Sequence, residues 1–228
     1  LDIACNSSNL TAVKILTDFI LNLNPEHNFT SEFSKSKSTE ICQYYLDKKV
    51  KLDILNNSNI SGLGALDIEL FEKIINNVDQ NYRFLFKDCI HSAIESRNVE
   101  VIDYILKENP PSGNELFESI QTNDIEVVNT ILKYNSQPSF INKKDYQRTP
   151  LCLATEQRNI EIVKRLLSIP GIDPSLYDNR NQDPLSRAVQ NYDYEITNAI
   201  LNFYGDDIEN HIDIANSAAY ELTNGISI

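Results

Sequence analysis

Few residues in this sequence have the types and spacing that a catalytic site requires. Cys89 and His91 are two residues apart, which on a helix directs their side chains differently, so they do not form the Cys/His pair of an activated nucleophile. His27 and His211 are distant from His91 and from each other, which argues against a histidine metal site. The sequence has no phosphate-binding glycine loop and no GxSxG or HExxH motif. We therefore expect no catalytic residue, metal, cofactor or small-molecule substrate.

The chain is acidic, and its charge excludes some classes of partner. Its 228 residues carry 20 Lys and Arg against 33 Asp and Glu, for a net charge of -13. An acidic pair such as Asp206 and Asp207 could bind a cation, but among 33 acids it is better explained as solvated surface charge. A net negative charge repels phosphate backbones and anionic lipids. With no apolar run of the roughly 18 to 20 residues that cross a bilayer, we expect neither nucleic-acid binding nor membrane insertion.

Cysteine usage favours an intracellular protein. The four cysteines are far apart and form no CxxC pair, which is typical of scattered thiols rather than a disulfide framework. Five N-x-S/T sequons would permit glycosylation, but an Asn- and Ser-rich stretch produces them by chance, and they all fall in the first 61 residues. We expect an intracellular, cytoplasmic location, and we treat the chain as a piece of a longer polypeptide because residue 1 falls within a predicted helical segment.

The elements of the chain repeat. TPLCLATEQRNIEIVKRLL begins at Thr149, and DPLSRAVQNYDYEITNAIL begins 34 residues later at Asp183. Thr149 and Asp183 can each cap a helix whose first residue is proline. Apolar residues then follow in two helical stripes separated by a polar turn, which predicts a helix-turn-helix. The small residues Ala154 and Ala188 are expected where two helices approach closely.

One position of the second helix recurs along the whole chain and predicts an all-α stack of about six to seven helix pairs. The steps between its occurrences are 29, 29, 31, 26, 35 and 34 residues. The units around the second and third occurrences are degenerate, because residues 30–38 and 56–61 are poor first helices. We expect divergent units over residues 1–88, a regular repeat domain over 89–228, and a truncated last unit at 212–222. The recurring residues are Val13, Cys42, Phe71, Ile102, Val128, Val163 and Thr197.

Residues 149–201 resemble the ankyrin repeat, whose consensus runs TPLHxAxxxGHxxxVxxLL and then GADVNxxDxxGxTPL. The connection GIDPSLYDNRNQDPL, from Gly171 to Leu185, matches that pattern, with Asn181 where the family has Gly. Asn tolerates a left-handed backbone best after Gly, so we expect the hairpin tip to survive the change. The resemblance implies an ankyrin-type solenoid with short hairpin connections in its C-terminal half. Family members hold protein partners on the concave side formed by hairpin tips and first helices.

The resemblance implies a non-catalytic scaffold that binds a partner protein on this face. The net charge favours a partner with a basic segment, because opposite fields raise association rates. The alternative is an architectural spacer or regulatory arm of a longer protein whose activity lies outside this chain. The residues expected to contact a partner are Asp145, Tyr146, Gln147, Glu156, Arg158, Tyr177, Asp178, Asn179, Arg180, Arg187, Gln190 and Tyr192.

Overall fold

The computed structural model describes residues 1–27, 29, 38–48, 61–77, 86–146 and 148–205. Regular secondary structure in these ranges is helical, and one isolated β-bridge joins Asp145 to Arg148. The predicted all-α class is confirmed. The expected truncated unit at 212–222 lies outside the described residues, as do most of the two poor first helices.

The chain divides into two compact units, an N-terminal unit of Leu1–Pro110 and a C-terminal unit of Pro111–Ile228. This division reflects compactness, whereas the expected boundary between residues 88 and 89 concerns where the repeats become regular, and that boundary stays a prediction. The helices of the N-terminal unit are α1 (Asp2–Asn6), α2 (Leu10–Leu23), α4 (Thr39–Lys48), the 3-10 helix η1 (Ser61–Ala65), α6 (Ile68–Asn77), α7 (Ile90–Glu95) and α8 (Val99–Glu108).

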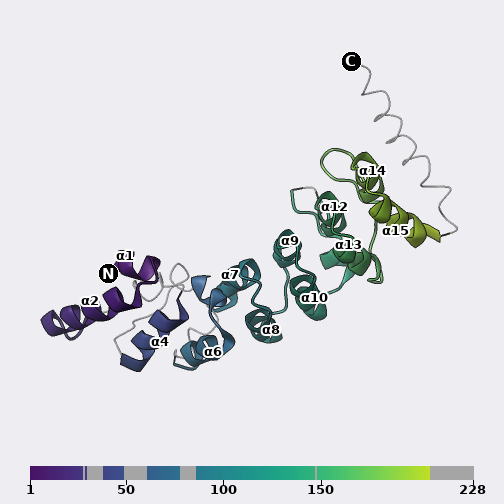
Figure 1. The fold of residues 1–228 in the computed structure, drawn as a ribbon. Coiled ribbons are helices and arrows are strands. Elements are labelled where there is room, and N and C mark those ends of the chain that lie inside the picture. The colour runs from purple at the N-terminus through teal and green to yellow at the C-terminus, as the bar shows by residue number, and fades with distance from the viewer. Residues whose placement is uncertain (28, 30–37, 49–60, 78–85, 147, 206–228) are drawn as a thin grey trace, which may run out of the picture. The chain divides into compact units, whose positions relative to one another are not determined.

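The described part of the C-terminal unit contains three helix pairs that stack in chain order (Figure 1). Among the first helices, α12 packs against both α9 and α14, and among the second helices α13 packs against both α10 and α15. The short helix α11, which begins at Pro138, was not predicted. The helices are α9 (Glu115–Gln121), α10 (Ile125–Tyr134), α11 (Pro138–Ile141), α12 (Pro150–Glu156), α13 (Ile160–Leu167), α14 (Pro184–Gln190) and α15 (Tyr194–Tyr204).

The recurring position of the second helix forms the core. Six of the seven predicted residues, from Val13 to Val163, are 0% exposed, and Thr197 is half-buried. Ala154 and Ala188 are also fully buried, as expected where helices approach closely. The hydrophobic effect along this row therefore holds each second helix in place.

The turn between the two helices has the same geometry in the five pairs in which both described helices are α-helices. Its central residue has a left-handed backbone with φ between 53° and 59°. The next N–H donates to the carbonyl of the buried alanine in four of the five turns, which closes the first helix as a Schellman motif. The Asn or Asp after the central residue then caps the second helix through its side chain. The central residues are Ser8, Arg97, Asn123, Arg158 and Tyr192.

A left-handed backbone favours glycine, so these turns store strain. We expect Arg97→Gly to raise the free energy of unfolding of the N-terminal unit by about 0.5–1 kcal/mol, because the clash of Cβ with the carbonyl is removed. Glu95→Gly, two residues earlier in a helix, is the control and should lower it by a similar amount. Urea unfolding followed by circular dichroism measures both. A fall in stability for Arg97→Gly would contradict the strain.

Gly64 permits η1 to lie directly against α7. A Cβ at this position would lie 2.2 Å from the Cys89 carbonyl oxygen and 2.6 Å from the Ala93 nitrogen, which are both backbone atoms. The Gly64 N–H also donates to Ser92 Oγ at 3.1 Å. The close approach thus depends on the absence of a side chain.

Gly64→Ala should destabilise the N-terminal unit by about 1–3 kcal/mol, because η1 and α7 must separate. Gly113→Ala is the matched control, since its Cβ would meet only the flexible side chain of Glu115 at 3.2 Å. Thermal unfolding of both variants provides the comparison, and equal stabilities would show that the approach of η1 to α7 is not required.

Candidate partner-binding surface

Two connections of the C-terminal unit form tight, hydrogen-bonded tips. In the first, Asp145 and Arg148 exchange two backbone hydrogen bonds of 2.9 Å, and Tyr146 between them has φ 45°. In the second, the Asp178 N–H donates to the Gln182 carbonyl at 2.9 Å, and Asn181 has φ 58°. The predicted left-handed conformation of Asn181 is confirmed.

The tips expose aromatic side chains on a fixed backbone. Tyr146 is 84% exposed and Tyr177 is 40% exposed. Asn179 and Arg180 are exposed beside Tyr177, and Asp145 is half-buried. Gln147 lies outside the described residues. We refer to Tyr146, Tyr177, Asn179 and Arg180 together as the tip surface.

Asp178 supports its tip from the inside. Its side chain is 0% exposed and accepts hydrogen bonds from the backbone N–H groups of Arg180 at 2.7 Å and Gln182 at 3.0 Å. The Arg187 guanidinium of α14, itself buried, donates to the second carboxylate oxygen. Asp178 and Arg187 were predicted among the contact residues; the structure places both below the surface, where they brace the tip.

A chain of ion pairs continues from this buried pair across two repeats. Glu156 of α12 lies 3.5 Å from Arg187 and 3.2 Å from Arg148 of the preceding tip. The four charges alternate in sign from one tip through two first helices to the next tip. Because the Glu156 carboxylate is paired with two arginines, it helps to fix the spacing of the repeats and is not free to bind a partner.

Further hydrogen bonds link successive repeats. Lys144 Nζ donates to the Tyr177 carbonyl at 2.8 Å, which ties one tip to the next. Asn142 Nδ2 donates to the Gly171 carbonyl at 2.8 Å, and its Oδ1 accepts from the Asp173 N–H at 3.0 Å. The backbone that carries the exposed side chains of the tip surface is therefore held by hydrogen bonds between successive repeats.

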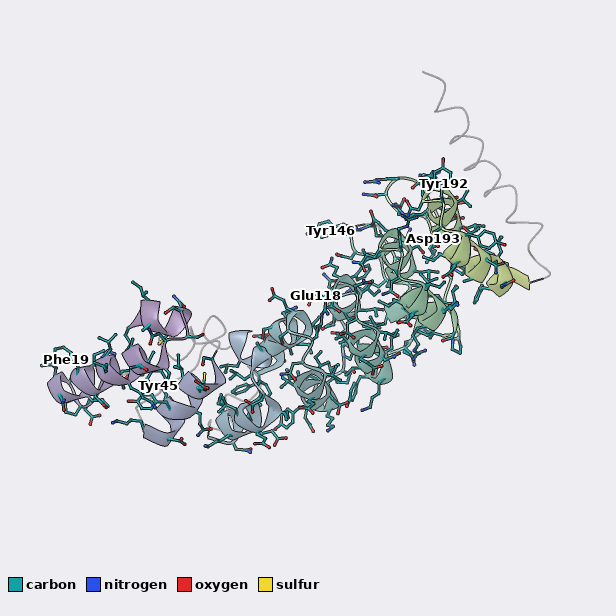
Figure 2. The ribbon with its side chains drawn as sticks, viewed as in Figure 1. Phe19, Tyr45, Glu118, Tyr146, Tyr192 and Asp193 are labelled. Atoms are coloured by element: carbon teal, nitrogen blue, oxygen red, sulfur yellow. The ribbon has the colours of Figure 1, made fainter. Side chains whose placement is uncertain are left out.

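The tips precede the N-terminal ends of α12 and α14. The remaining predicted residues lie at the C-terminal ends of these first helices or in the turns that follow them. Arg158 is exposed and donates to the Asn191 carbonyl at 2.5 Å, so it links two turns. Tyr192 is 72% exposed on the second of these turns (labelled in Figure 2). Gln190 is half-buried and accepts from the Gln182 side chain at 2.6 Å. The eleven predicted residues that the structure describes thus separate into exposed residues and residues that hold the repeats together.

Sequence reasoning missed two features of this surface. Arg148 was not predicted, although it pairs with Glu156. Arg148 precedes α12 and Glu156 is its last residue, so the pair follows no helical spacing that the sequence would show. Tyr194, 82% exposed on α15, was not predicted either, although tyrosine is a residue type that often contacts partner proteins.

The cysteine environment agrees with a structural role. Burial, with Asp88 nearby, raises the pKa of the Cys89 thiol to about 12 against an opposing hydrogen bond with the Gly64 backbone. Burial likewise raises the pKa of Cys152. His91 is exposed whereas Cys89 is buried, so their side chains point apart as expected. Both thiols remain protonated at neutral pH.

Within the described residues, no group of three or more His, Cys, Asp or Glu side chains is arranged to hold a metal ion. None of the helices in this part of the chain is both long enough and apolar enough to cross a membrane.

The repeated part of the chain is similar in sequence to known proteins. Residues 116–212 match the family model described as ankyrin repeats, in three copies. Residues 116–212 are ankyrin repeats. An ankyrin repeat protein of Fowlpox virus (strain NVSL) is 36% identical over 100 residues, which cover 42% of this chain and 22% of the viral protein. The match therefore spans about a fifth of that relative's length.

The buried pair in the second tip of the ankyrin repeats should govern stability in acid. Burial raises the pKa of Asp178, but the Gln182 N–H, the Arg187 guanidinium and the Arg180 N–H together hold it below the usual 3.8. A carboxyl whose pKa is lower in the folded state stabilises above its unfolded pKa and loses that contribution as pH falls through the folded pKa.

We expect Asp178→Asn to destabilise the C-terminal unit by about 2–4 kcal/mol at pH 7, because it removes the nearer of the two carboxylates that pair with the buried Arg187. The variant should also lose less stability than the parent chain between pH 4 and pH 2. Asp145→Asn, at the half-buried position of the other tip, is the control and should change little. Equal effects of the two substitutions in urea unfolding would contradict the bracing role.

Proposed function

We propose that the ankyrin repeats of the C-terminal unit bind a partner protein through the tip surface, flanked by Arg158 and Tyr192. The observation that carries the proposal is the exposure of Tyr146 and Tyr177 on tips whose backbones are fixed by hydrogen bonds. A rigid exposed aromatic loses little conformational entropy on binding. Tyrosine and arginine are also the residue types that supply most interface energy, about 2 kcal/mol or more each when centrally buried.

The supporting residues make this surface selective for shape rather than for charge. Arg187 is already paired with both Glu156 and Asp178, so recruiting any of the three for a partner would require breaking ion pairs within the repeats. Lys144 is likewise engaged with a carbonyl of the next tip. Binding at the tips therefore depends mainly on the tyrosines and on Arg180.

We further propose a partner that carries a basic segment, on the basis of the chain's net charge of -13. The tips themselves are not acidic, so this attraction acts through the field of the whole chain and raises the association rate. Raising the salt concentration should slow association while leaving dissociation nearly unchanged.

The double variant Tyr146→Ala/Tyr177→Ala tests the proposal in affinity purification with the chain as bait. A partner recovered stoichiometrically with the parent chain should bind the double variant at least about tenfold more weakly, since each lost anchor exceeds roughly 1.4 kcal/mol. Tyr194→Ala is the matched control, because Tyr194 is 82% exposed but lies on the second helix α15.

Two outcomes would contradict this function. Loss of binding in Tyr194→Ala with retention in the double variant would place the contact on the second helices. Recovery of no stoichiometric partner, together with an enzymatic or channel segment elsewhere in the same polypeptide, would favour the architectural spacer.

A further inference from the structure

Helix α2 carries an apolar stripe that the described residues leave uncovered. Ile15 is 65% exposed, Phe19 is 59% exposed and Leu23 is 72% exposed (Phe19 is labelled in Figure 2). The three residues are spaced by four, so they lie on one face of the helix. The opposite side of α2 carries the buried Val13 and Thr17, and Thr17 Oγ1 donates to Tyr45 of α4 at 3.5 Å.

The register of the other second helices identifies what this stripe faces. Counting from the N-cap, the sixth residue of a second helix contacts the second helix of the preceding pair. Arg165 Nε of α13 donates to Asn129 of α10 at 2.8 Å, and Tyr44 OH of α4 donates to Asp18 of α2 at 3.5 Å.

The same rule holds for two further helices of the N-terminal unit. Lys73 Nζ of α6 lies 3.4 Å from Asp47 of α4. The Tyr104 ring of α8 meets the Phe71 ring of α6 edge to face, with centroids 5.9 Å apart. Four second helices therefore use their sixth residue to contact the pair before them.

Ile15 is the sixth residue after the N-cap Asn9 of α2. We propose that the stripe of Ile15, Phe19 and Leu23 is a docking surface for one further helix pair of the same repeat type, contributed by the same polypeptide on the N-terminal side of α1. The second helix of that pair packs on the stripe as α2 packs on α4. A terminal repeat that ends a stack presents a polar outer face, whereas this face is apolar.

The size of the stripe favours this occupant over a second copy of the chain. Its side chains expose on the order of a few hundred Å², whereas a standard interface buries roughly 800 Å² on each partner. A helix pair on the same polypeptide needs no such area, because it loses no translational freedom on docking.

Hydrogen exchange with and without an added helix pair tests the proposal. The probe is residues 149–184 of this chain, which contain α12 and α13, fused ahead of Leu1 in the full chain. Ala4 then follows Pro184 by four residues, as Ala188 does, so the repeat register is kept. The added pair should slow exchange of the α2 amides by about tenfold or more.

Substitutions on the stripe make the test specific. Ile15→Glu/Phe19→Glu should abolish the slowing. The control Lys14→Glu makes the same change in charge at an exposed position of α2 that faces Tyr44 of α4, away from the stripe, and should retain the slowing. The proposal is overturned if the added pair does not slow exchange, or if the slowing survives in the Ile15/Phe19 variant.

Two measurements on the chain without the added pair complete the test. The urea midpoint of Ile15→Glu/Phe19→Glu should equal that of the parent chain, since both side chains are exposed; a lower midpoint would show that the stripe already belongs to the fold. Sedimentation should give a monomer, and a dimer that Phe19→Glu dissociates would assign the stripe to a second copy instead.

Discussion

The structure depends on one constraint: a single pair of short helices cannot bury its own apolar stripe, so each pair needs its neighbours. First helices of six or seven residues, such as α7, α9, α12 and α14, are too short to be stable alone in water. Burial of the recurring second-helix position supplies the stability that local propensity does not. The fully buried Ala154 and Ala188 let helices approach closely enough for that burial.

The same constraint explains why the chain tolerates strained turns. A left-handed residue such as Arg158 or Tyr192 costs on the order of 1 kcal/mol, yet it closes the first helix and places a capping side chain at the start of the second. It also determines which residues are available for recognition. The ion pairs of Asp178, Arg187 and Glu156 fix the spacing of the repeats. The tyrosines and Arg180 remain exposed at the surface.

Much of the fold could be predicted from the sequence because the repeat carries local signals. Proline after a capping residue, the buried alanine and the second-helix ladder each have a physical cause that acts within a few residues, and the structure confirms them at Thr149, Asp183 and Val163. The left-handed turns could not be predicted in the same way, because Arg and Tyr replace the glycine that marks such a turn. The short helix α11 carried no periodic signal in its four residues.

The candidate site was less predictable because residue type does not reveal partners distant in sequence. Asp178 and Arg187 look like free surface charges in the sequence, but the fold brings them together in a buried pair although they are nine residues apart. Tyr146 lies between the two hydrogen-bonded residues of its tip whereas Tyr177 precedes Asp178, and the exposed fractions of the two side chains differ twofold. Only the packing of neighbouring repeats decides such differences.

Amide hydrogen exchange of Ala188→Leu in the full chain tests the dependence on neighbours most directly. An overpacked residue in α14 should accelerate exchange most in α14 and α15, less in α12 and α13, and hardly at all in α9 and α10. Uniform acceleration through all three pairs would show a single cooperative core instead, and would contradict the account of stability as a sum over adjacent repeats.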